Sequence, residues 1–196
     1  GYGCPYMADY FLDHAEKKKQ PLGRCKLNSI KNTQEGLSIS WTAVDGAEGY
    51  KIYRKSTGES YSCVYTVGGG VNSFVDKNVM SGKKYRYMVR PVGDSEIGAA
   101  ENAAELLRLA QPKPVAANGY KGMVVSWNKI SGATMYNVYR KKSGSTAWTL
   151  IRTVTGSADS ITDSSANKGT TYIYTVKAYG MERGARMILW DRQCTD

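Results

Sequence analysis

An internal repeat limits what this chain can fold into more than any other feature of its sequence. Residues 37–54 (LSISWTAVDGAEGYKIYR) return as residues 123–140 (MVVSWNKISGATMYNVYR). Matching positions are 86 residues apart at first and 87 residues apart from Asp76 and Asp163 onwards. The extra residue falls near residues 57–60, in a Gly/Ser-rich stretch such as a hairpin loop tolerates. Because 196 residues suit one large domain or two small ones, the repeat predicts two homologous modules.

Within each module, apolar and polar residues alternate with a period of two. In segment 37–41 the residues Leu, Ile and Trp alternate with serines. In segment 85–90 two tyrosines and a valine alternate with Arg86, Met88 and Arg90. This pattern is typical of strands with one buried and one solvent-facing side, and glycine-containing turns separate the segments at short intervals. We therefore predict an all-β fold with about seven antiparallel strands per module, packed as two sheets.

Three strand segments carry recognisable residues in both modules. One ends in Trp41 or Trp127, the next reads GYKIYRK or MYNVYRKK, and a later one reads KKYRYMVRPV or TTYIYTVKAY. Together they resemble fibronectin type III modules, especially those repeated in secreted and cell-surface proteins of bacteria, notably Gram-positive ones. The resemblance implies two immunoglobulin-like β-sandwiches in tandem. It also implies that the two tryptophans lie in the cores and that Tyr85 and Tyr172 form tyrosine corners.

The repeat and the resemblance predict three segments along the chain. These are an N-terminal extension (1–23), a first module (24–110) and a second module (111–196). The linker 109–115 contains two prolines, which favour a stiff, extended joint and a rod with limited bending. The composition of segment 99–110 favours a helix, but the repeat predicts the last strand of the first module there.

The N-terminal extension has no counterpart in the second module. Its pattern predicts a short helix from Pro5 to about Lys19, with Tyr6, Tyr10 and Phe11 on one side. One interpretation is an aromatic docking helix for a partner. The other is a helix that caps the end of the first module.

The four cysteines are Cys4, Cys25, Cys63 and Cys194, and they form no CxxC pair. Four cysteines allow three disulfide connectivities, and the sequence does not choose among them. We favour a Cys4–Cys25 disulfide, with four reduced thiols as the alternative. Cys63 matches Leu150 in the repeat, so we expect it to be a small buried hydrophobic residue on a strand.

The sequence contains no catalytic or metal-binding motif. The one histidine is His14, and neither a nucleophile elbow, a phosphate-binding loop nor a zinc-binding pattern is present. Asp163 matches Asp76, which favours a structural role at a strand over acid–base catalysis. Mean hydropathy is −0.46 and no apolar run approaches 18 residues. We expect a protein that is not an enzyme, binds no metal or cofactor and has no membrane span.

Positive charge suggests one candidate binding surface. The net charge is +10, and residues 111–196 hold 12 Lys and Arg against 5 Asp and Glu, whereas residues 36–110 hold 9 against 8. Arg140, Lys141 and Lys142 are consecutive on or just after a predicted strand. They could hold an anionic partner such as a cell-wall polymer, an acidic glycan or an acidic protein. The alternative is a solvated face that aids solubility.

Aromatic residues suggest a second candidate surface. Tyr61 matches Trp148 in the repeat, and Tyr120 lies beside a glycine in a predicted loop. Tyr and Trp side chains stack on sugars and anchor in protein pockets. Alternatively, Trp148 covers the edge of its own sheet.

The resemblance to fibronectin type III modules implies a non-enzymatic extracellular region of a bacterial surface or secreted protein that acts as a spacer and binds a protein or a glycan, and the repeat, the alternating strands and the absence of catalytic motifs support this expectation. Anionic partners are among the candidates, and no motif for specific nucleic-acid recognition is present. The sequence does not determine the oligomeric state. The alternatives are an accessory module of a larger secreted carbohydrate-active enzyme, or a structural protein of a phage or other virion, such as a decoration or tail protein.

Overall fold

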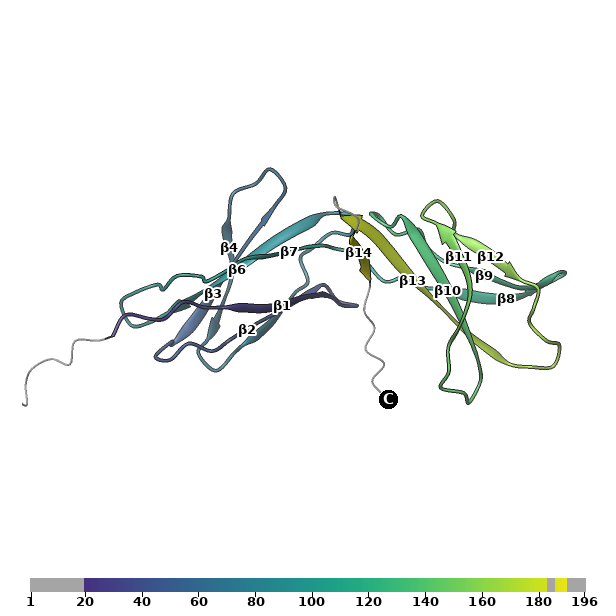
Figure 1. Cartoon of the computed structure of the whole chain (residues 1–196), viewed down its shortest axis with the longest axis horizontal. Coiled ribbons are helices and arrows are strands. Elements are labelled where there is room, and N and C mark those ends of the chain that lie inside the picture. The colour runs from purple at the N-terminus through teal and green to yellow at the C-terminus, as the bar shows by residue number, and fades with distance from the viewer. Residues whose placement is uncertain (1–19, 183–185, 190–196) are drawn as a thin grey trace, which may run out of the picture.

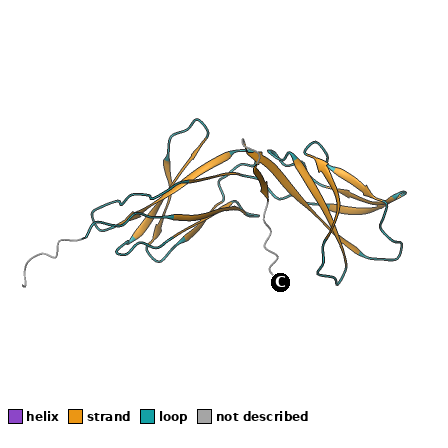
Figure 2. Ribbon diagram, in the orientation of Figure 1, coloured by secondary structure: helices purple, strands orange, loops and turns teal. Residues whose placement is uncertain are grey.

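The computed structural model describes residues 20–182 and 186–189, and within them it contains strands and no helix (Figures 1 and 2). Two β-sandwiches lie end to end along the long axis of the molecule. The predicted fold class, two immunoglobulin-like sandwiches of fibronectin type III kind in tandem, is confirmed. The predicted N-terminal helix, with Tyr6, Tyr10 and Phe11, lies outside the described residues.

Each sandwich is made of seven of the described strands. The first module contains β1 (Leu27–Asn32), β2 (Leu37–Trp41), β3 (Gly49–Ser56), β4 (Ser62–Gly68), β5 (Ser73–Asp76), β6 (Lys84–Val92) and β7 (Ala104–Leu107). The second module contains β8 (Val115–Gly119), β9 (Gly122–Ser126), β10 (Met135–Lys142), β11 (Thr149–Thr155), β12 (Ser160–Asp163), β13 (Tyr172–Glu182) and β14 (Arg186–Leu189).

The two modules share one topology. In the first, a three-stranded sheet β1-β2-β5 faces a four-stranded sheet β4-β3-β6-β7; in the second, β8-β9-β12 faces β11-β10-β13-β14. All ladders within the named strands are antiparallel. The β10–β11 hairpin loop is one residue longer than the β3–β4 loop, which places the insertion where the repeat predicts it. Strand β7 confirms a strand in segment 99–110.

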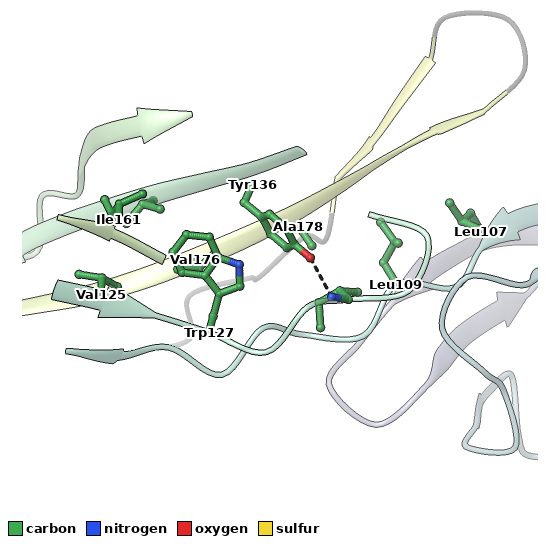
Figure 3. Close-up of a cluster of buried hydrophobic side chains, with 10 residues drawn as sticks. Leu107, Leu109, Val125, Trp127, Tyr136, Ile161, Val176 and Ala178 are labelled. Carbon is green, nitrogen blue, oxygen red and sulfur yellow. Dashed lines mark hydrogen bonds between the residues drawn. The ribbon is translucent and has the colours of Figure 1, made fainter. Parts of the chain in front are cut away.

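Each core is built around a tryptophan between the two sheets. Trp41 and Trp127 are 2% and 6% exposed. Each lies 5.5 Å, between ring centroids, from a buried tyrosine of the next strand, Tyr50 or Tyr136. The hydroxyl of Tyr136 accepts a hydrogen bond from the Ile130 backbone N–H at 2.7 Å (Figure 3). The core tyrosine therefore satisfies its polar end by fixing the loop that precedes its own strand.

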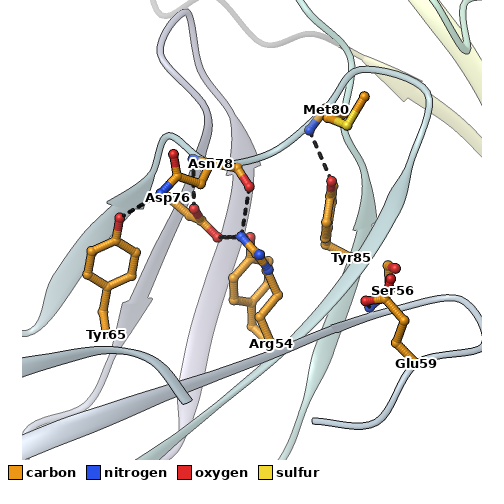
Figure 4. Close-up of polar contacts among 9 residues, drawn as sticks. Arg54, Ser56, Glu59, Tyr65, Asp76, Asn78, Met80 and Tyr85 are labelled. Atoms are coloured by element: carbon orange, nitrogen blue, oxygen red, sulfur yellow. Dashed lines mark hydrogen bonds and ion pairs between the residues drawn. The ribbon is translucent and has the colours of Figure 1, made fainter. Parts of the chain in front are cut away.

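A buried carboxylate ties the two sheets of each module together. In the first module, Asp76 ends β5 and is completely buried. Its Oδ2 accepts hydrogen bonds from Arg54 Nη1 on β3 at 2.7 Å and from the Tyr87 hydroxyl on β6 at 2.8 Å (Figure 4). Both donors come from the opposite sheet, so this inter-sheet clamp sets the position of one sheet relative to the other.

The second module repeats the inter-sheet clamp with matching residues. Asp163 ends β12 and accepts hydrogen bonds from Arg140 at 2.7 Å and from Tyr174 at 2.8 Å. A carboxylate that is buried needs such partners, because an unpaired buried charge is strongly destabilising.

A tyrosine hydroxyl also closes the turn before the sixth strand of each module. Tyr85 accepts a hydrogen bond from the Met80 backbone N–H at 3.0 Å (Figure 4). Tyr172 does the same for the Asn167 N–H at 3.4 Å. This is the geometry of a tyrosine corner.

The joint between the modules is packed with apolar side chains. Leu109 is completely buried, although it precedes β8, and it belongs to the same core cluster as Tyr136. A Cβ added at Gly180 would lie 2.6 Å from Leu107 Cδ2 and 3.3 Å from Leu109 Cδ1, so the leucines lie against bare backbone. The end of the first module thus forms part of the second module's core.

Polar side chains hold the chain on both sides of the joint. The Ser81 hydroxyl donates to the Ser131 carbonyl at 2.8 Å and accepts from the Ala110 N–H at 2.9 Å. Asn32, which is 3% exposed, donates to the Leu107 carbonyl and accepts from the Leu109 N–H. The linker is therefore hydrogen-bonded to the first module at Leu109 and Ala110, and the Lys113 N–H donates to Asn128 Oδ1 of the second module at 2.8 Å.

Leu22, at the other end of the first module, occupies a position equivalent to that of Leu109. Leu22 lies 87 residues before Leu109, and Gly93 lies 87 residues before Gly180. A Cβ at Gly93 would lie 3.2 Å from Leu22 Cδ1, much as one at Gly180 would lie 3.3 Å from Leu109 Cδ1. The repeat thus includes the leucine that precedes each module.

The predicted burial of Cys63 is wrong. Cys63 lies on the edge strand β4, as expected, but its side chain is exposed. The ladder shifts register between Ile52 and Tyr53, so Val64 packs against the core while Cys63 lies opposite Tyr53 on the outer face. Leu150, the matching residue of the second module, is 50% exposed. An apolar residue at this position therefore does not indicate burial.

Cys25 is completely buried, and its thiol donates to the Thr42 carbonyl at 3.8 Å. Burial, with a smaller effect of Glu101, raises the pKa of this thiol to about 11. Cys4 lies outside the described residues, so the Cys4–Cys25 disulfide stays a prediction.

We predict that Leu109→Ala destabilises the second module rather than the first. Emptying this buried site costs about 3 kcal/mol of unfolding free energy, because the fixed backbone around it cannot collapse into the space. Amide hydrogen exchange followed separately in the two modules measures the effect. Leu150→Ala, at a half-exposed position, is the control and should change stability by less than about 1 kcal/mol. Equal acceleration of exchange in both modules would contradict the assignment.

Candidate binding faces

Arg140 does not belong to the predicted cationic surface. Its guanidinium pairs with Asp163 in the inter-sheet clamp, and its side chain is only 17% exposed. The alternation of β10 turns Arg140 inwards, where it lies 4.4 Å from the centre of the Tyr172 ring. Lys141, one residue later, turns outwards. The three consecutive cations that the sequence suggested as one patch are therefore divided between the interior and the outer face.

Lys141 and Trp148 do come together. Lys141 Nζ lies 4.9 Å from the centre of the half-buried Trp148 ring, which is within the range of a cation–π contact. Lys142, the last residue of β10, is exposed, and the alternation of the strand turns it to the side opposite Lys141. The repeat-matched residues in the first module do the same: Lys55 Nζ lies 5.0 Å from the centre of the Tyr61 ring.

Tyr120 lies apart from these pairs. It is fully exposed in the turn between β8 and β9, beside a surface hollow that Lys168 and Tyr172 also line. Tyr61 and Trp148 lie in different modules. The six predicted surface residues are therefore distributed over several places and form no single site.

A second cation–π pair recurs in both modules, and the sequence analysis missed it. Arg90 lies over Tyr53 at 5.8 Å in the first module, and Lys177 lies over Tyr139 at 5.3 Å in the second. These residues also match through the repeat. Each module thus carries two such pairs at equivalent positions on the outer face of its four-stranded sheet.

The densest group of cations lies on the first module, not the second. Lys51, Lys55, Arg86 and Arg90 alternate with buried residues on β3 and β6, so all four point outwards; we call them the four-cation face. In the β3–β6 ladder, Lys51 lies opposite Arg90 and Lys55 lies opposite Arg86. Like charges directly opposite one another on neighbouring strands are destabilising. The first module therefore maintains two unfavourable pairs on one face.

Among the strands of the first module's four-stranded sheet, only β7 carries an acidic residue. Glu105 on β7 lies opposite Arg86 on its other side and pairs with Lys84 at 3.6 Å. The other acidic residues of this module lie in loops or in the inter-sheet clamp: Glu35, Asp45, Glu48, Glu59, Asp76, Asp94, Glu96 and Glu101. The net charge of the first module is near zero because the cations on its outer face are balanced mainly by acidic residues in its loops. The total charge therefore does not reveal that the two kinds of charge lie in different places.

The second module keeps only half of this arrangement. At the positions equivalent to the four-cation face, Lys141 lies opposite Ile173 and Lys177 lies opposite Asn137. The charge on this face is thus lower in the module whose overall charge is higher. The strand alternation around Arg86 and Arg90 was the signal in the sequence that could have revealed the difference.

The inter-sheet clamp of the second module shifts the pKa values of its members. Burial acts to raise the pKa of Asp163, but hydrogen bonds from Ser165, Tyr174 and Arg140 outweigh it, so the pKa lies below its usual value. Burial, followed by the hydrogen bond to Asp163, raises the pKa of Tyr174 to about 12. The native state therefore favours an ionised Asp163 and a neutral Tyr174.

Comparison with known proteins found similar solved structures. No protein-family model matches the chain. One similar solved structure is a two-domain fibronectin type III segment of chicken tenascin, with 14% sequence identity, coverage of 87% of this chain and 97% of that one, and a TM-score of 0.44. Another is the FN1–FN3 domains of chicken CNTN1, with 16% identity, coverage of 88% and 66% respectively, and a TM-score of 0.38. The assignment of the fold rests on the strand order of this chain.

The described residues contain neither a cluster of metal-binding side chains nor a membrane-spanning helix. Within residues 20–182 and 186–189, no three His, Cys, Asp or Glu side chains are grouped to hold a metal ion. The same residues include no helix with the length and hydropathy needed to cross a membrane.

We predict that Asp163→Asn lowers the unfolding free energy of the second module by about 3 kcal/mol, because it leaves Arg140 without its buried partner. Since the folded-state pKa of Asp163 is lowered, its stabilisation is present above the unfolded pKa of about 3.9 and is lost as the pH falls through the folded pKa. Urea unfolding at several pH values should therefore show the two proteins converging in acid. Asp159→Asn, in an exposed pair with Lys129, is the control and should cost less than about 1 kcal/mol.

We also predict that Lys51→Glu stabilises the first module by about 0.5 kcal/mol, because it converts the Lys51–Arg90 pair into one of opposite charges. Thermal unfolding at low ionic strength provides the measurement, and the gain should shrink as salt is added. A loss of stability would show that the two cations do not repel each other.

Proposed function

We propose that this chain is a non-enzymatic, extracellular region of a bacterial surface or secreted protein, in which two fibronectin type III-like modules act as a spacer and bind an anionic protein or glycan. The observation that carries the proposal is the repetition of two cation–π pairs at equivalent positions on both modules. Side chains whose only task was to keep the protein soluble would not need to recur with the same geometry.

The joint supports the spacer role. Leu109 is buried in the second module, while Asn32 and Ser81 of the first module hold the linker by hydrogen bonds. Gly82 and Gly132 bring the two modules into backbone contact, since a Cβ at Gly132 would lie 2.7 Å from Gly82 Cα. Such contacts favour a fixed angle between the modules over free rotation about a flexible linker.

The outer face of the second module supports anion binding. Lys141 and Lys177 point outwards from its central strands, and Lys142 is exposed at the end of β10. Strands β10 and β11 contain no acidic residue, and β13 contains none before Glu182. A face with cations and no nearby carboxylates attracts anions over distances of about 10 Å at moderate salt.

We predict that Lys141→Glu combined with Lys142→Glu reduces binding to anionic ligands by roughly tenfold at low salt, and by less at physiological salt. The measurement is a binding screen against arrayed glycans and surface proteins at both ionic strengths. Arg140 is left unchanged because its replacement would break the inter-sheet clamp. The control is Lys26→Glu combined with Lys31→Glu, which changes the net charge equally on the exposed side of the first module's three-stranded sheet. Unchanged binding by the Lys141/Lys142 variant would exclude this face.

A further inference from the structure

We infer that the four-cation face of the first module binds a linear acidic polysaccharide. The inference rests on the proposed binding function, and it names both the ligand class and the module that provides the principal site. The sequence pointed to the second module, because only the total charge of each module was visible there.

The four-cation face has an energetic cost to the fold. Lys51–Arg90 and Lys55–Arg86 are cross-strand pairs of like charge, and such pairs destabilise a sheet. The neighbouring strands place no acidic residue opposite Lys51, Lys55 or Arg90, whereas Glu105 lies opposite Arg86. A bound anion would supply a counter-charge to Lys51, Lys55 and Arg90. Residues that reduce stability while forming an ordered array are typical of binding sites.

The two cationic pairs are separated along the strands. Between them lies one row, Tyr53 opposite Met88, so the pairs are four residues apart along each strand. Four residues of a β-strand span about 13 Å. A small anion can therefore contact only one pair at a time. A ligand that uses both pairs must carry acidic groups at intervals along an extended chain.

The aromatic and apolar side chains of this face favour a polysaccharide over other polyanions. Tyr53 and Tyr61 are each already covered by a cation, so the face offers no free aromatic platform on which nucleic-acid bases could stack. The middle row is half-buried and provides no exposed apolar anchor of the kind that dominates protein interfaces. A sugar chain needs neither feature, because its acidic groups pair with Lys and Arg while its hydroxyls remain partly hydrated.

Two of the four cations, Lys55 and Arg90, are held in place by contacts within the first module. Arg90 donates to the carbonyls of Gly98 and Ile97 at 2.8 and 3.3 Å, so its guanidinium is fixed before any ligand arrives. Lys55 rests on the Tyr61 ring. Ordering these side chains in advance reduces the entropy lost on binding. Each pair also combines one Lys with one Arg, whose planar fork matches carboxylate or sulfate oxygens.

The test measures binding of the full chain to a carboxylated polysaccharide, polygalacturonate, and to a sulfated one, heparin, with neutral dextran as the blank. The variant Lys51→Glu/Lys55→Glu creates two opposite-charge pairs, so we expect it to fold at least as stably as the wild type. It should bind about tenfold more weakly, and the slope of log affinity against log salt should be roughly halved. The control Lys26→Glu/Lys31→Glu carries the same change in net charge and should bind within about twofold of the wild type.

Preference for polygalacturonate or for heparin identifies the acidic group as carboxylate or sulfate, and either result supports the inference if the variant loses binding. Equal loss in the control, or no binding of the wild type to either polymer, overturns it. Binding to polyglutamate or duplex DNA that is at least as strong and is lost in the same variant overturns the polysaccharide assignment. If Lys141→Glu/Lys142→Glu loses polysaccharide binding while Lys51→Glu/Lys55→Glu keeps it, the inference fails and the proposed function stands.

Discussion

The inter-sheet clamp is the contact on which the rest of each module depends. A single carboxylate at the end of the fifth strand accepts bonds from an arginine and a tyrosine of the opposite sheet. If the sheets slid past one another, a buried charge would lose its partners, and the energetic cost would be several kcal/mol. The clamp also determines orientation along β3: because Arg54 points inwards, Lys51, Tyr53 and Lys55 point outwards. The outward direction of Lys51 and Lys55 is therefore coupled to the internal ion pair of Arg54 with Asp76.

The two modules use the same scaffold with different surfaces. The tryptophan–tyrosine pair and the inter-sheet clamp recur with the same distances, and the tyrosine corner recurs with a hydrogen bond of 3.0 Å in the first module and 3.4 Å in the second. The outer face instead changes from two cationic pairs to one cation in each row, with Ile173 and Asn137 at the other positions. The scaffold is thus repeated closely, while the face that can meet a ligand differs between the two copies.

Much of the fold could be predicted from the sequence, because the alternation of apolar residues and the repeat act on neighbouring positions. The strand content, the two modules, the loop with the inserted residue and the core tryptophans follow from such local patterns. Contacts between distant strands do not. Arg140 resembled a surface cation because its partner Asp163 lies 23 residues away, and Cys63 resembled a core residue because a register shift in β4 is invisible in sequence.

The candidate site was harder to predict for a related reason. Charge was counted along the chain, whereas a ligand meets charge on a face. In the first module, acidic loop residues cancel the strand cations in any count but lie elsewhere in space. Only strand pairing places Lys51 beside Arg90 and Lys55 beside Arg86.

Because Leu22 and Leu109 occupy equivalent positions, the same kind of joint could connect further modules. Leu22 lies against Gly46 and Gly93 much as Leu109 lies against Gly132 and Gly180. If another copy of the first module were joined so that its final leucine took the place of Leu22, the contacts of the joint would be repeated. Longer arrays could then be assembled from whole modules with a constant step between them. The distance spanned would be set by the number of modules, with no new linker to design.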